Sequence, residues 1–90
     1  MTDRSWTYPD DLLRALLDFG LAPAPGTPPR FVRDQVNELY RFEIRRLRDQ
    51  LRAGAVAKAD YVGLVIALRK KYWPLTLQPG DWDKICGRTG

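Results

Sequence analysis

The 90-residue sequence contains no histidine and a single cysteine, Cys86. Histidine is the commonest general base near neutral pH and the commonest metal ligand, and structural zinc sites combine several Cys and His side chains. One cysteine also excludes an intrachain disulfide framework and agrees with a reducing cytoplasm. We therefore expect no metal site, no bound cofactor and no catalysis by this chain. Cys86 itself could be a reactive thiol beside Lys84 and Arg88, but a lone cysteine of this kind is more often incidental.

Two further kinds of segment are missing. No run of about 18 apolar residues occurs, which predicts that no part of the chain spans a membrane. The opening residues, MTDRSWTYPDD, lack the basic and then apolar pattern of a signal peptide, and no glycine-rich phosphate loop or nucleophile motif is present. Since 44% of the residues are hydrophobic and 29% are charged, we expect one globular domain over residues 1–90, in the cytoplasm.

The clearest pattern that is present is one long amphipathic helix over about residues 28–53. Thr27 is a suitable N-cap, Pro28 fits the first helical turn, and Gly54 can supply the left-handed residue that closes a helix. At about 100° per residue, one broad arc collects the apolar side chains of Val32, Val36, Leu39, Tyr40, Ile44, Leu47 and Leu51. This stripe predicts a helix with one buried face.

Two other helices are expected, over about residues 8–19 and 57–72. Thr7 and Gly20 would bound the first of them, and Pro74 would end the other. The short connection after Gly54 predicts that the two longer helices form an antiparallel hairpin. The predicted fold class is therefore all-α, a small three-helix domain built on this hairpin, with the termini loose at residues 1–6 and in the last three positions.

The segments between and after the helices are rich in proline. Residues 21–29 form either an ordered turn that packs the first helix across the hairpin, or a semi-rigid arm that lets it reach a partner. The turn is favoured because the linker is short. The tail, residues 74–90, is bounded by prolines and predicted to be irregular, with an extended piece at Leu75 and Leu77 and one short helical turn capped by Asp81.

One carboxylate, Glu43, falls inside the apolar arc of the long helix. A buried carboxylate without a partner is costly. Arg69 lies similarly inside the apolar arc of the third helix, at a position that the hairpin brings close to Glu43, so a Glu43–Arg69 pair is predicted to fix the helix register, with Arg46 as a competing partner. Glu43 could instead reach solvent, and a catalytic role has no second acid, base or ligand to support it.

A row of arginines lies on the face of the long helix opposite the core. It consists of Arg41, Arg45, Arg48 and Arg52. Like charges at i,i+4 slightly disfavour an isolated helix, so the row is either a solvated face, a docking surface for an acidic protein, or a nucleic-acid contact. Asp34, Glu38 and Asp49 interrupt it and no aromatic residues interleave with it, which weighs against nucleic acid.

Several large apolar side chains exceed what this small core needs. Phe31 and Phe42 lie eleven residues apart, on one face but outside the main stripe. Either the first helix covers them, or they form an interface with another chain together with Trp6, Trp73 or Trp82. Aromatic residues and arginine are enriched at the centres of protein interfaces.

These patterns favour a small non-catalytic interaction protein. We expect an accessory subunit, assembly factor or adaptor of a larger cytoplasmic complex, whose partner is another protein with an acidic or mixed surface. A homo-oligomer is also possible. Two alternatives are a nucleic-acid-associated regulator that binds through the basic face, since the net charge is +4, and a small subunit of an enzyme whose catalytic residues lie mainly on a partner chain.

Overall fold

The structure is a computed structural model that describes residues 5–89. The elements in chain order are β1 (Ser5–Thr7), α1 (Asp10–Asp18), α2 (Pro29–Arg52), α3 (Lys58–Lys71), the 3₁₀ helix η1 (Trp73–Thr76), α4 (Pro79–Ile85) and β2 (Gly87–Thr89). The predicted all-α class is confirmed. The part of the chain between residues 5 and 89 has no helix that is both long and apolar enough to cross a membrane.

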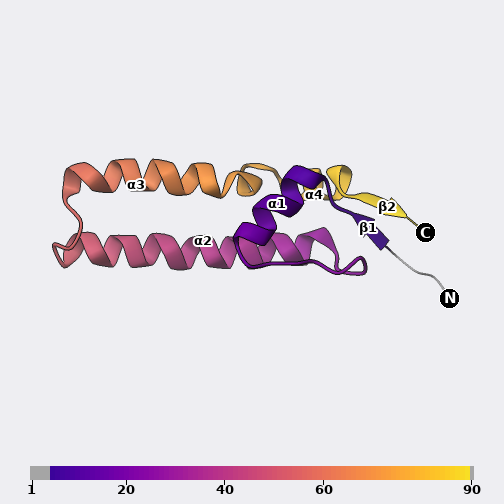
Figure 1. The fold of residues 1–90 in the computed structure, drawn as a ribbon, viewed down its shortest axis with the longest axis horizontal. Coiled ribbons are helices and arrows are strands. Elements are labelled where there is room, and N and C mark those ends of the chain that lie inside the picture. The colour runs from indigo at the N-terminus through magenta and orange to yellow at the C-terminus, as the bar shows by residue number, and fades with distance from the viewer. Residues whose placement is uncertain (1–4, 90) are drawn as a thin grey trace.

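The molecule is elongated, with extents of 56 × 19 × 17 Å. Helices α2 and α3 run antiparallel along its long axis, as the hairpin prediction required, and the two strands lie beyond them at one end (Figure 1). Helix α1, the segment from η1 to α4 and both strands gather at one end, around the start of α2 and the end of α3 (Figure 1). The other end of the hairpin consists of α2, α3 and their connection alone.

The helix starts differ from the prediction. Pro9 and Pro28 occupy the N-cap positions of α1 and α2, and neither helix has a side-chain cap hydrogen bond, so the caps assigned to Thr7 and Thr27 were wrong. Prolines remove N–H groups that would otherwise need a cap. The carbonyl of Thr27 instead accepts a hydrogen bond of 2.8 Å from the Tyr8 hydroxyl.

The helix ends agree with the prediction, because Gly20 and Gly54 have φ angles of 82° and 79°. We expect Gly54→Ala to lower the free energy of unfolding by about 1 kcal/mol, since an alanine there must adopt left-handed backbone. A Cβ at Gly54 would meet no atom within 4 Å, so the effect is purely conformational.

Gly63, inside α3, provides the matched control for this prediction. Open space also surrounds the position that a Cβ would occupy there, and its backbone is helical, so Gly63→Ala should stabilise the chain by up to about 1 kcal/mol. Urea unfolding followed by circular dichroism measures both changes. Two shifts of the same sign would contradict the assigned backbone conformations.

The core occupies the end of the hairpin where the other elements gather. Its buried members are Tyr8, Leu12, Leu16, Val32, Val36, Tyr72, Trp82 and Cys86. Trp82 is completely buried, and its indole Nε1–H donates to the carbonyl of Pro74 at 2.9 Å. The Arg33 Nε–H donates to the carbonyl of Leu77 at 3.2 Å. The tail is therefore bound to α2 and contributes the largest core side chain.

The tail is more regular than predicted. The segment expected to be extended at Leu75 and Leu77 begins as the 3₁₀ helix η1, and the predicted turn is the helix α4, which starts before Asp81. Asp81 is not the N-cap. Its carboxylate accepts a hydrogen bond of 3.1 Å from the backbone N–H of Gln78, which precedes the helix.

The segments near both termini pair with each other. Strands β1 and β2 are antiparallel, with Trp6 opposite Arg88, so the expectation of loose ends was wrong for residues 5–6 and 88–89; residues 1–4 and 90 lie outside the described chain. The proline-rich linker is ordered, because the Trp6 N–H donates to the Pro25 carbonyl at 2.8 Å and the Leu21 N–H donates to the Leu16 carbonyl at 2.8 Å. Helix α1 thus packs on its own hairpin, as the turn interpretation predicted.

Candidate functional site

The larger part of the hairpin, residues 41–71, has no other element packed over most of its length, and only its α3 end lies beside α1 (Figure 1); we call it the free half. Of the α2 stripe, only Val32 and Val36 are buried, and α3 has no buried residue. Four large apolar side chains of the free half are exposed: Phe42 (61%), Val62 (58%), Ile66 (48%) and Leu64 (43%). The sequence does contain an indication of this surface, the uncharged run YVGLVIAL at residues 61–68. A helix that is apolar on every face is normally buried on more than one side.

Positive charge is concentrated on the same half. Residues 41–71 contain nine arginines and lysines against three carboxylates, whereas the rest of the chain has more carboxylates than basic groups. All four arginines of the predicted row, Arg41, Arg45, Arg48 and Arg52, are exposed. Arg41 lies 3.7 Å from Glu38; the other three form no ion pair with the described residues.

Two open depressions lie side by side on the free half. The larger, of about 490 Å³, is lined by Phe42, Arg45, Arg46, Asp49, Gln50, Ala53 and Ala55. The smaller, of about 240 Å³, is lined by Glu43, Arg46, Leu47, Gln50, Leu64 and Leu68. Arg46 and Gln50 line both, so the two depressions are neighbours on α2, and the smaller one reaches α3; together we call them the α2–α3 band. The predicted arginine row contains Arg45 but not Arg46. Helical phase along α2 does not show which side chains of α3 lie beside each α2 residue.

Glu43 has partners other than the one predicted. Its carboxylate accepts a hydrogen bond from the Tyr72 hydroxyl and lies 3.6 Å from the Lys71 Nζ. Arg69 is exposed and forms no ion pair with Glu43, so the predicted Glu43–Arg69 pair was wrong, and Glu43 is half-buried. Glu43 is still tied across the hairpin, to residues two and three positions beyond Arg69.

Tyr72 connects this carboxylate to the core. Its ring stacks on Phe19 with centroids 4.4 Å apart and meets Tyr40 edge-on at 5.3 Å. Burial raises the pKa of the Tyr72 hydroxyl well above its usual range, and the hydrogen bond and negative charge of Glu43 raise that pKa further. The hydroxyl therefore stays protonated at neutral pH and donates its hydrogen bond to Glu43. This contact has a structural role.

The aromatic residues separate into covered and uncovered ones. Phe31 and Phe42 are exposed by 59% and 61%, so α1 does not cover them and that interpretation was wrong. Trp82 is completely buried and Trp73 and Trp6 are half-buried, which excludes Trp82 as a direct partner contact in this structure. Of the predicted aromatic contacts, Phe31 and Phe42 are the most accessible.

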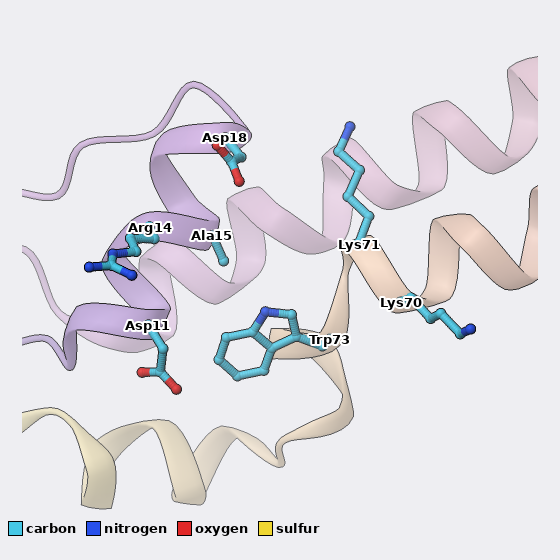
Figure 2. Close-up of a pocket in the computed structure, with 7 residues that line it drawn as sticks. All are labelled: Asp11, Arg14, Ala15, Asp18, Lys70, Lys71 and Trp73. Atoms are coloured by element: carbon cyan, nitrogen blue, oxygen red, sulfur yellow. The ribbon is translucent and has the colours of Figure 1, made fainter.

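A further depression, of about 490 Å³, lies between α1 and the end of α3. Its lining consists of Asp11, Arg14, Ala15, Asp18, Lys70, Lys71 and Trp73. Figure 2 shows that the charged ends of Arg14, Lys70 and Lys71 point in different directions and do not converge above Trp73. The positive charges of this depression are therefore spread around its rim and are not focused on one point.

Cys86 is buried and free. Burial, with a smaller contribution from the charge of Asp83, raises the pKa of its thiol to about 11. Because only the thiolate reacts rapidly with disulfide reagents, a buried thiol with this pKa is poorly suited to redox chemistry.

We expect native Cys86 to react at least about tenfold more slowly with Ellman's reagent at pH 8 than the same thiol in denaturant, since two pKa units alone reduce the thiolate about a hundredfold. The native rate should reach half its maximum near pH 11, where half of the thiol is ionised, and the denatured rate should reach half its maximum near pH 9. Stopped-flow absorbance at several pH values measures both. Equal native and denatured rates would show that Cys86 is accessible.

Residues 5–89 contain no group of three or more His, Cys, Asp and Glu side chains placed to hold a metal ion. Comparisons with protein-family models, with curated proteins and with solved structures find no match to this chain. The most distinctive surface of the described chain is that of the free half, with its exposed apolar and arginine side chains.

Proposed function

We propose that this chain is a small non-catalytic interaction module, an accessory subunit, assembly factor or adaptor within a larger cytoplasmic complex. The observation that carries the proposal is the coincidence, on the free half, of exposed Phe42, Val62, Leu64 and Ile66 with the positive charge of the chain. Phe42 and Leu64 line neighbouring depressions that share Arg46 and Gln50, and apolar surface rimmed by polar residues is a mark of interaction sites. Cys86 is a free thiol, which agrees with the reducing cytoplasm that we propose for this chain.

The test is capture from a native lysate with the full chain as bait, at low and high salt, followed by mass spectrometry. The wild type is compared with Phe42→Glu/Leu64→Glu and with Lys84→Glu, a control on exposed α4 surface at the other end of the molecule. The same partner should be retained by the wild type and the control and lost by the double variant. If the chain emerges alone as a monomer under both salt conditions, the proposal is wrong.

The same capture separates the two alternatives. A regulator that binds nucleic acid would lose its partner when mixed-sequence DNA is added, and its affinity would fall steeply with salt. A subunit of an enzyme would co-purify with an activity that disappears when the chain is removed. An interaction module predicts neither DNA competition nor a dependent activity, and a double variant that still captures the partner would place the contact elsewhere on the chain.

A further inference from the structure

Helix α1 shows how a short helix can pack on this hairpin. Helix α1, DDLLRALLD, carries three aspartates and one arginine, and it buries Leu12 and Leu16 against the covered half, where Val32 and Val36 are also buried. It is thus an acidic amphipathic helix that packs on the basic hairpin through its leucines. Phe19, the residue that follows α1, lies near the free half, because the Lys71 Nζ is 6.0 Å from its ring centroid and 3.6 Å from the Glu43 carboxylate.

The α2–α3 band begins where α1 ends. Glu43, held by Lys71, lines the smaller depression of the band. Beyond it the band exposes apolar atoms of Leu64 and Phe42, with the guanidinium groups of Arg45 and Arg46 beside them. These two arginines form no ion pair with any described residue. The free half therefore exposes apolar atoms of the kind that α1 covers on the other half, and it adds arginines that form no ion pair with the described residues.

We infer that the α2–α3 band binds one amphipathic helix of a partner protein, with leucine-like residues along one face and carboxylates beside them. The inference rests on the proposed function and specifies the chemistry of its partner. From Arg41 to Arg52, α2 extends about 18 Å, which is the length of roughly three helical turns of such a partner. The apolar face of that helix packs on Leu64, Leu68 and Phe42, and its carboxylates meet Arg45 and Arg46, because guanidinium groups bind carboxylates in a bidentate manner.

A second copy of the chain is disfavoured by charge. Two free halves facing each other would bring together nine basic groups from each chain against three carboxylates from each. Like charges at an interface oppose association. An acidic helix instead neutralises the arginines while it covers the apolar atoms.

The test uses the full chain and fluorescently labelled synthetic helical peptides of about three to four turns. One peptide carries leucines at i, i+3, i+4 and i+7 with glutamates beside them, and a matched peptide has lysine in place of each glutamate. Poly-glutamate and mixed-sequence duplex DNA serve as purely charged probes. Fluorescence anisotropy should show saturable binding of the leucine–glutamate peptide, at least tenfold tighter than that of the leucine–lysine peptide or poly-glutamate.

Two pairs of variants locate the contact. R45Q/R46Q and L64Q should each weaken binding of the leucine–glutamate peptide at least tenfold. R48Q/R52Q removes the same charge from the same helix outside the band, and V62Q removes an exposed apolar side chain outside it; both should change binding by less than threefold. All six positions are exposed, and circular dichroism confirms that each variant is folded.

Several results would overturn the inference. One is that the leucine–lysine peptide, poly-glutamate or duplex DNA binds as tightly as the leucine–glutamate peptide. Another is that R45Q/R46Q and R48Q/R52Q weaken binding of the leucine–glutamate peptide equally. The last is a stable dimer of the chain in sedimentation equilibrium that L64Q abolishes. Failure here is distinct from failure of the proposed function. If the peptides do not bind but Phe42→Glu/Leu64→Glu still loses a captured partner, the module binds a protein of different chemistry.

Discussion

Replacing Trp82 by alanine is expected to lower the free energy of unfolding by about 3–5 kcal/mol, the range for deleting a buried aromatic side chain. Trp82 has no exposed surface, and its indole donates to the Pro74 carbonyl, so the change leaves both a cavity and an unpaired acceptor. Total stability of small domains is about 5–15 kcal/mol. The variant should therefore be only marginally folded at physiological temperature.

Trp73 provides the control, because it is the same residue type, lies at the start of η1 just before the tail, and is half-buried. Trp73→Ala should cost less than half as much in urea unfolding monitored by circular dichroism. If Trp82→Ala costs less than about 1 kcal/mol, well below the range for a buried aromatic side chain, the tail does not close the core in the way the structure places it.

Truncating Tyr72 is expected to have a similar effect, about 3–5 kcal/mol for Tyr72→Ala. Its ring is buried and stacks on Phe19 while meeting Tyr40 edge-on. The change therefore removes the contact that holds the end of α1 on the hairpin. Thermal and urea unfolding should both show the loss, and near-ultraviolet circular dichroism should report loosened aromatic packing.

Tyr72→Phe separates the ring from the hydroxyl. It keeps the stacking but removes the donor to Glu43, which is half-exposed and retains Lys71 at 3.6 Å. We expect a loss of only about 1 kcal/mol, since solvent can replace the lost partner of a half-exposed carboxylate. A loss as large as that of Tyr72→Ala would mean that the Glu43 hydrogen bond, and not the ring packing, dominates this part of the core.

Helix positions could be predicted from the sequence because they depend mainly on nearby residues. The predicted range of about 28–53 for the long helix compares with Pro29–Arg52, and the range of about 57–72 compares with Lys58–Lys71. Gly20 and Gly54 end their helices because their left-handed backbone favours a residue without a side chain. The antiparallel hairpin follows from the short connection between two helices.

The candidate site could be predicted only in part. The arginine row is on the surface, as expected, and Phe42 does line the α2–α3 band. Arg46, Gln50 and Leu64 were not expected there, because a band between two helices depends on the rotation of both. A shift of two or three positions along α3 replaced Arg69 with Lys71 and Tyr72 as the partners of Glu43.

By itself the sequence determined the positions of α1, α2 and α3, the antiparallel order of the two long helices, and the surplus of arginine and apolar side chains. The tertiary structure alone decided where those side chains are covered. Trp82 lies in the core because the tail packs back on α2, and Phe42 and Leu64 are exposed because α1 covers only one half of the hairpin. Burial depends on contacts between distant segments, and a periodic pattern within one helix shows which face is apolar but not what packs on it.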